Sequence, residues 1–138
     1  MMILKGNQYE DARGIITSNN EFDVSQVKRI YTIENHSTEF IRGWQGHAIE
    51  QRWFACMKGR FKIYVIKVDD FEKPSKDLPI QTYELSDKEL TYLHVKAGCI
   101  TAIQGLEKGS KLIALSDYAM GEVNDEYRFD LDYFINKC

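Results

Sequence analysis

The sequence predicts an all-β domain, and a jelly roll of two packed antiparallel sheets is the architecture that suits it best. Apolar residues occur in short runs rich in β-branched and aromatic side chains, which is the composition of strands. Turn-forming residues separate these runs at the spacing typical of a sandwich or barrel. Helical periodicity is weak throughout. The 138 residues suit a single domain, 1–138, with one hydrophobic core.

Each predicted strand is a run of this kind. The first, 27–33, reads Val-Lys-Arg-Ile-Tyr-Thr-Ile. The predicted strands in chain order are 27–33, 52–57, 61–68, 80–85, 91–95, 100–104 and 111–116. Lys58 and Gly59 separate the second from the third and predict a two-residue hairpin turn. Both prolines fall in the polar stretch 69–79, which predicts a long, solvated loop. Single helical turns are expected at 86–90 and within 130–136.

Composition excludes several classes of function. The net charge is −3 and no basic block occurs, so nucleic-acid binding has no electrostatic support. No apolar run approaches the ~20 residues that a membrane helix needs. The first residues lack a secretory apolar region and a small-residue cleavage site, so we expect a cytoplasmic protein. Cys56, Cys99 and Cys138 form an odd set without a C-x-x-C motif, which predicts free thiols.

The densest polar and aromatic segment runs from Arg42 to Phe54. Side chains alternate between the faces of a strand, so Gln45 and His47 share one face and Trp44 lies on the other. Glycines 43 and 46 weaken a strand and often mark a close approach of backbone or ligand. Arg42 and Arg52 flank the histidine, with Glu50 between. This pattern suits a ligand site, but a polar surface strand with an inert His47 is equally compatible with it.

Four short motifs occur in a fixed order along the chain. They are Asp11-Ala12-Arg13-Gly14, Val27-Lys28-Arg29-Ile30-Tyr31, Arg42-Gly43-x-x-x-His47 and Ser116-Asp117-Tyr118. In this order the chain resembles the small cupin sugar-nucleotide enzymes, namely the dTDP-sugar 3,4-ketoisomerases and the WxcM-like group. It is more distantly similar to dTDP-4-dehydrorhamnose 3,5-epimerase. The resemblance covers about residues 6–134.

The resemblance implies a cupin jelly roll, a homodimer, and action on a nucleotide-linked 4-keto-6-deoxy sugar (dTDP-linked) in surface polysaccharide synthesis. It places His47 on the second histidine of R-G-x-H-A-H, the expected base. Arg42 falls on the motif arginine, and Tyr31 on the tyrosine of K-R-x-Y. Two family histidines are replaced, one by Gln45 and one at about Thr101.

The implied chemistry starts with removal of a proton beside a carbonyl, which needs a base and a donor for the enolate oxygen. His47 is the best available base, because histidine as a residue type suits proton transfer near neutral pH. Tyr31 or Tyr118 is a candidate to donate or return the proton. Arg42 suits enolate or diphosphate charge, because a planar guanidinium binds both. The further substrate-binding candidates are Gln45, Glu50, Arg52 and Thr101. Candidates to orient the imidazole are Glu50, Asp130 and Asp132.

Stacking on a base or sugar is open to Trp44, Trp53 and Tyr64, although aromatic residues in strands more often belong to the core. His36 is expected to be a solvated loop residue, and His94 can face either way. Only His47 and Glu50 look like metal ligands, so no metal and no organic cofactor is expected.

Three functions remain compatible with the sequence: a sugar-nucleotide isomerase or epimerase, a cupin that binds a nucleotide sugar or glycan without turnover, and a cupin for an unrelated metabolite.

Overall fold

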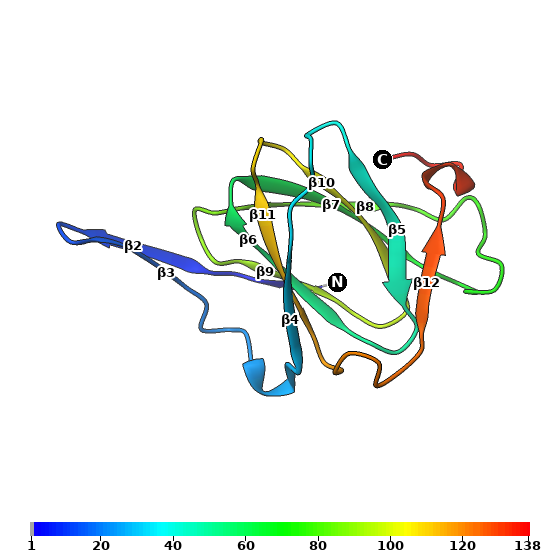
Figure 1. Cartoon of the computed structure of the whole chain (residues 1–138), viewed down its shortest axis with the longest axis horizontal. Coiled ribbons are helices and arrows are strands. Elements are labelled where there is room, and N and C mark those ends of the chain that lie inside the picture. The colour runs from blue at the N-terminus through cyan, green and yellow to red at the C-terminus, as the bar shows by residue number, and fades with distance from the viewer. Residues whose placement is uncertain (1) are drawn as a thin grey trace.

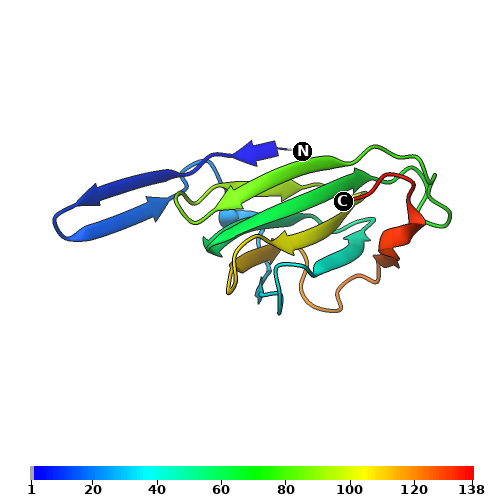
Figure 2. The same cartoon turned by 90° about the horizontal axis from the view of Figure 1, so that it is seen from above.

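The computed structural model describes residues 2–138, and it is a jelly roll of two facing five-stranded antiparallel sheets (Figures 1 and 2). The strands of the first sheet, in spatial order, are β1 (Met2–Leu4), β9 (Tyr92–Val95), β6 (Arg52–Lys58), β11 (Lys111–Ser116) and β4 (Arg29–Ile33). Those of the second sheet are β12 (Glu126–Phe129), β5 (Ile41–His47), β10 (Cys99–Gly105), β7 (Arg60–Lys67) and β8 (Gln81–Ser86). The all-β prediction is confirmed.

A separate hairpin and two short 3-10 turns complete the fold. The hairpin consists of β2 (Asn7–Asp11) and β3 (Gly14–Ser18), and it projects away from the two sheets (Figure 1). The 3-10 turns are η1 (Val24–Gln26) and η2 (Leu131–Tyr133). Within residues 2–138, no helix has the length and apolar character required to cross a membrane.

All seven predicted strands are present, with ends within two residues of the prediction. Strands β1, β2, β3 and β12 escaped prediction because they are short, polar or mostly exposed. Of the two predicted helical turns, the one within 130–136 is present as η2, whereas the one at 86–90 was wrong. Strand β8 continues to Ser86, and 130–136 contains only the three-residue η2.

The predicted hairpin at Lys58–Gly59 was also wrong. Strand β6 pairs with β9 and β11, whereas β7 pairs with β8 and β10, so the corner carries the chain from one sheet to the other. Gly59 has φ 78° and packs against Ser110, where a Cβ would lie 2.2 Å from Oγ. Strands β6 and β7 each lie inside a sheet with a partner on either side, and both are largely buried.

The apolar side chains form two main layers. One lies between the sheets and includes Phe54, Phe61 and Leu93. The other covers the outer face of the second sheet, where Trp44 and Phe134 pack under the loop 69–79. That loop is therefore partly an apolar cover, fixed to the C-terminal segment by main-chain and side-chain hydrogen bonds.

All three cysteines are free, as predicted. Cys56 and Cys99 are buried, and burial raises the pKa of the Cys56 thiol to about 11. Both are therefore neutral packing residues at physiological pH.

A β-bulge in β5 decides which side chains face the space between the sheets. Gln45 pairs with Thr101 on β10, but the next pair is Arg42 with Ile103, so two residues of β5 oppose Ala102. The extra residue reverses the alternation, because a strand side chain normally changes face at every step. Arg42 consequently joins Gln45 on the inner face. Strict alternation would have placed it outside with Trp44.

Gly46 permits the close approach of β5 to β10. A Cβ at this position would lie 2.1 Å from the carbonyl oxygen of Cys99 and 2.6 Å from the Cα of Ile100. We expect Gly46→Ala to destabilise the fold by about 1–3 kcal/mol, the usual cost of overpacking. Gly43→Ala is the matched control, because its Cβ would meet only the Leu131 side chain, at 3.4 Å. Urea unfolding should separate the two variants, and equal midpoints would refute the argument.

Candidate active site

A cavity of about 380 Å³ opens between the sheets where β4 and β5 face each other. Its walls come from β4, β5, β6 and β10. Seven of the eight sequence-predicted site residues line it: Tyr31, Arg42, Gln45, His47, Glu50, Arg52 and Thr101. Sequence reasoning missed two further cationic residues of the lining, Arg29 and Lys96. With them, the lining holds four cationic side chains and three carboxylates.

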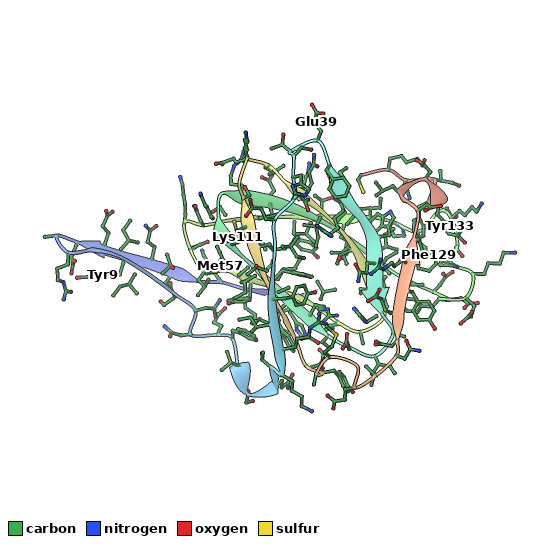
Figure 3. The ribbon with its side chains drawn as sticks, in the orientation of Figure 1. Tyr9, Glu39, Met57, Lys111, Phe129 and Tyr133 are labelled. Atoms are coloured by element: carbon green, nitrogen blue, oxygen red, sulfur yellow. The ribbon has the colours of Figure 1, made fainter. Side chains whose placement is uncertain are left out.

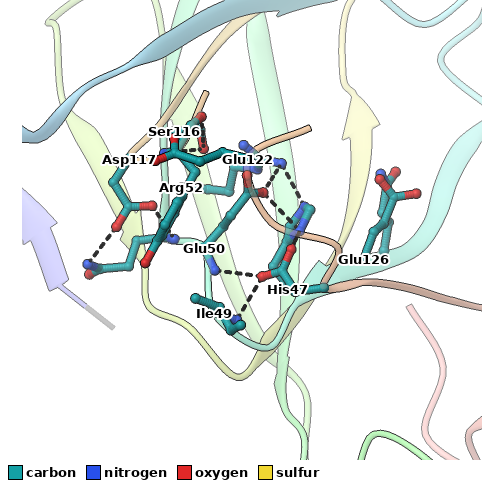
Figure 4. A network of polar contacts seen from close by, with 12 residues as sticks. His47, Ile49, Glu50, Arg52, Ser116, Asp117, Glu122 and Glu126 are labelled. Carbon is teal, nitrogen blue, oxygen red and sulfur yellow. Dashed lines mark hydrogen bonds and ion pairs between the residues drawn. The ribbon is translucent and has the colours of Figure 1, made fainter. Parts of the chain in front are cut away.

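His47 lies at the buried end of β5 inside a network of charged groups (Figure 4). Its Nδ1 lies 2.9 Å from Oε2 of Glu50 and 3.1 Å from Oδ1 of Asp125. Its Nε2 lies 2.6 Å from Nη2 of Arg52. All four side chains are buried, so these contacts are shielded from bulk water.

This geometry fixes the tautomer of His47. Arginine has only donors, so Nε2 accepts the hydrogen bond from Arg52 and carries no proton. The ring proton is therefore on Nδ1, which donates to Oδ1 of Asp125, and the Glu50 carboxylate lies beside it. A neutral imidazole with its lone pair on Nε2 is the form required of a general base.

Asp125 is the member of this network that the sequence did not reveal. It precedes β12, and its Oδ2 accepts the backbone N–H groups of Ile49 and Glu50 at 2.8 and 2.7 Å. Burial acts to raise the pKa of Asp125, but these hydrogen bonds and the one from His47 outweigh it and leave the pKa below the ordinary value. Asp125 therefore remains ionised and anchors both the turn after β5 and the imidazole.

Arg52, at the start of β6, joins His47 to Glu50. Its Nη2 donates to Glu50 Oε2 at 2.9 Å as well as to His47. Its other terminal nitrogen, Nη1, is buried and has no hydrogen-bond partner among residues 2–138. The residue is only 7% exposed.

Tyr31 projects from β4 into the same cavity. The Arg29 and Arg52 guanidinium carbons lie 4.7 and 5.5 Å from the centre of its ring. Burial raises the pKa of the Tyr31 phenol against the opposing effect of the two arginines, so the hydroxyl stays protonated at neutral pH. It is available as a proton donor.

Arg42 lies toward the mouth, where its Nε donates to Oδ1 of buried Asn35 at 3.2 Å. Asn35 is itself held by the carbonyl of Ile103. Arg42, Gly43 and Gln45 also line a second, more open cavity of about 530 Å³. The two cavities therefore share a wall at Arg42. The second is completed by Trp44, Arg128, Phe129, Asp130 and Tyr133.

The two positions where the resemblance leads one to expect histidine lie side by side. Gln45 and Thr101 are direct partners across β5 and β10, and Thr101 Oγ1 donates to the Gln45 carbonyl at 3.4 Å. Both line the cavity beside His47. The substitutions thus form one neutral patch.

Tyr118 is the predicted site residue that the fold leaves outside the cavity lining. It follows β11 on a turn where Ser116 Oγ accepts the Tyr118 N–H. Asp117 accepts the backbone N–H of Gln51 at 2.8 Å and its side-chain amide at 3.1 Å. The Ser116-Asp117-Tyr118 motif therefore braces the segment before β6.

The other candidates lie away from His47. Asp132 is exposed and Asp130 precedes η2, so Glu50 and the unpredicted Asp125 are the carboxylates that orient the imidazole. Trp53 and Tyr64 belong to apolar clusters and do not line the main cavity; Trp44 also belongs to one. His94 stacks on Trp53 at 4.7 Å and contacts Gln51 Oε1 at 2.7 Å.

One atom each from His47, Glu50 and Asp125 lies within 4.8 Å of the other two, and these are metal-ligand types. In the geometry described, however, Nδ1 bears the ring proton and Arg52 already holds the Glu50 oxygen. A cation at this point would have to displace both. The donor set fits an imidazole–carboxylate network better than a metal centre.

A protein-family model described as "FdtA: WxcM-like, C-terminal" matches residues 1–138. No match was found among curated proteins. Solved structures share the fold at low sequence identity. The 3,4-ketoisomerase QdtA from Thermoanaerobacterium thermosaccharolyticum, as a variant in complex with TDP-4-keto-6-deoxyglucose, has a TM-score of 0.71 and 20% identity, covering 93% of this chain and 86% of that one.

Two further structures are similar. The TDP-quinovose 3,4-ketoisomerase WlaRB from Campylobacter jejuni has a TM-score of 0.67 and 18% identity, covering 98% of this chain and 97% of that one. The rmlC epimerase from Mycobacterium tuberculosis has a TM-score of 0.74 and 13% identity, covering 98% of this chain and 72% of that one. At these identities the likeness shows the fold.

Proposed function

Because the chain belongs to the FdtA (WxcM-like, C-terminal) family, we propose that it is a sugar-nucleotide isomerase or epimerase that acts on a 4-keto-6-deoxy sugar by enolisation. We propose a dTDP-linked substrate and a cytoplasmic place in surface polysaccharide synthesis. The structural neighbours that carry TDP or a TDP-sugar support the ligand class.

The proposal rests on one observation: His47, with its proton on Nδ1 hydrogen-bonded to Asp125 and its Nε2 beside Arg52, lines a cavity that also holds Arg29, Arg42 and Lys96. Such a base can take a proton from the carbon beside a ketone while nearby donors stabilise the resulting oxyanion. Tyr31 is the phenol placed to return a proton. Tyr118 does not enter this proposal because it lies outside the lining.

The shared wall at Arg42 suits a ligand with two parts. A sugar in the inner cavity and a nucleoside in the outer one would place the diphosphate between them, beside Arg42. Arg128 of the outer cavity adds a second cation. Guanidinium groups bind phosphate through paired hydrogen bonds, so this arrangement supports a nucleoside diphosphate sugar.

The decisive experiment is incubation with dTDP-4-keto-6-deoxyglucose in deuterium oxide, followed by proton NMR. Turnover predicts loss of a sugar proton to solvent, a new keto sugar, or both. Neither change, with the nucleotide sugar bound, would contradict the catalytic proposal.

Binding of the nucleotide sugar without either change would favour a non-catalytic binding protein. The neutral Gln45–Thr101 patch also supports that alternative. A binding protein predicts no exchange in the wild type and weaker affinity in Arg42→Ala. Failure to bind either dTDP or the keto sugar would point to the third alternative, an unrelated metabolite.

We also propose that function requires no metal or organic cofactor. The expected result is an exchange rate, or a ligand affinity if exchange is absent, that EDTA treatment leaves unchanged. If EDTA abolished exchange or ligand binding and one transition metal restored it, the His47–Glu50–Asp125 cluster would be assigned to a cation instead.

We propose a homodimer in which the β2–β3 hairpin packs on a second copy. Tyr9, Ile15 and Ile16 are 60%, 56% and 61% exposed on this hairpin, and Figure 3 shows Tyr9 far from the two sheets. An isolated two-stranded hairpin is marginally stable in water, and contiguous exposed apolar residues mark an interface. The interface should bury more than ~1,000 Å² in total.

Light scattering at micromolar concentration should therefore give twice the chain mass. The variant Tyr9→Ser with Ile16→Ser should shift the mass toward the monomer. Met120→Ser, at a residue 75% exposed elsewhere, is the control and should remain dimeric. A monomeric wild type would refute the proposal.

A further inference from the structure

Two features of the Arg52 guanidinium are unfavourable. Its Nη1 is buried without an acceptor, and buried donors are nearly always paired. Its Nη2, by donating to Nε2 of His47 at 2.6 Å, occupies the lone pair that the base would use. Both features concern one guanidinium on the wall of the cavity.

A ligand oxygen in the cavity would relieve both. If the guanidinium turned toward such an oxygen, Nη1 would gain an acceptor. Nη2 would give up Nε2 but keep Glu50 Oε2, now at 2.9 Å, so no new donor would be left unpaired. The ring of Tyr31 offers an apolar face beside which the guanidinium can move while keeping its cation–π contact.

We propose that Arg52 is the oxyanion-binding residue of this cavity, and that its contact with the keto oxygen of the ligand releases Nε2 of His47. Nε2 then takes the proton from the adjacent carbon. The electrons of that C–H bond form a carbon–carbon double bond, and the carbonyl π electrons move to the oxygen held by Arg52. The ketone thus both exposes the base and accepts the charge, which leaves Arg42 for the diphosphate.

The catalytic half of this inference rests on the proposed enolisation, but the oxygen-binding half does not. Comparing a ligand that carries the ketone with one that does not separates the catalytic half from the oxygen-binding half. The inference requires Arg52 to matter for dTDP-4-keto-6-deoxyglucose and not for dTDP, which lacks the keto sugar.

Arg52→Lys is the informative variant, because it keeps a cation beside buried Glu50 while it removes the second planar nitrogen. Arg52→Gln with Glu50→Gln is a second variant without an unpaired buried charge, should the lysine variant fold poorly. Arg60→Lys is the control. Arg60 pairs with Glu84 and Glu107 on the surface, so exchange should be unchanged.

If the wild type exchanges, Arg52→Lys should lower kcat about 10²–10³-fold, the cost of removing one oxyanion donor, with dTDP affinity within twofold of wild type. If the wild type does not exchange, enolisation fails. The oxygen site then predicts at least tenfold weaker binding of the keto sugar to Arg52→Lys, with dTDP binding unchanged. Wild-type rate and keto-sugar affinity in Arg52→Lys, or an equal loss of dTDP and keto-sugar affinity, would overturn the inference.

Discussion

Replacement of His47 by asparagine is expected to slow solvent exchange at the sugar by about 10²–10⁴-fold, the usual contribution of a general base. Asparagine can retain a hydrogen bond toward the carboxylates but offers no basic nitrogen. Affinity for dTDP should change little, because His47 lies in the inner cavity and Arg42 toward the outer one. Exchange measured by proton NMR in deuterium oxide, with calorimetry for dTDP binding, tests both statements.

His94→Asn is the matched control for that variant. His94 also hydrogen-bonds a glutamine oxygen and stacks on a tryptophan, but it is not part of the cavity lining. Its exchange rate should equal that of the wild type. If His47→Asn loses less than tenfold, His47 is not the base and the proton must go to another group.

The strands were predictable because burial imposes a local pattern on the chain. Runs such as 61–68 and 100–104 carry β-branched and aromatic residues, whatever their partners in space. The pairing of the strands could not be predicted in this way, because it depends on residues far apart in the sequence. The Lys58–Gly59 corner has the composition of a hairpin turn, yet it changes sheets, because β6 and β7 each take two other partners.

The candidate site was predictable only in part, for the same reason. His47 and Glu50 share one polar segment, so the sequence placed them together. Asp125 lies 78 residues further along and is brought to His47 only by the pairing of β12 with β5. The bulge that turns Arg42 inward has no signal beyond Gly43, since a glycine in a strand has several explanations.

Asp125→Asn is expected to slow exchange about 10²-fold. The asparagine oxygen will accept the backbone N–H groups of Ile49 and Glu50, as Oδ2 does now at 2.8 and 2.7 Å. Its amide group then faces Nδ1 of His47 as a donor and favours the tautomer with the proton on Nε2. A proton on Nε2 takes away the lone pair that would act as the base, and it places two donors, Nε2–H and Nη2–H of Arg52, against each other. A wrong tautomer costs ~10⁴ in a serine-protease triad, but the negative charge of Glu50, whose Oε2 lies 2.9 Å from Nδ1, still favours a proton on Nδ1 here, so the loss should be smaller.

Asp117→Asn separates this effect from a loss of folding. Asp117 also accepts a backbone N–H and a side-chain amide, both from Gln51, but it does not contact His47. We expect it to lower the unfolding temperature while the exchange rate stays at the wild-type value. Equal losses of exchange in both variants would show that Asp125 acts only through the stability of the turn after β5.

The pH dependence of stability provides a further test of the role of Asp125. The pKa of Asp125 is lowered in the folded chain, so its ionised form adds stability that is complete above the ordinary aspartate pKa of about 3.9. This contribution is lost as the pH falls through the lower, folded pKa. The difference in unfolding temperature between wild type and Asp125→Asn should therefore be largest near pH 7 and shrink below about pH 4. A difference that stays constant across this range would mean that the charge on Asp125 does not hold His47 and the turn in place, and the tautomer argument would lose its anchor.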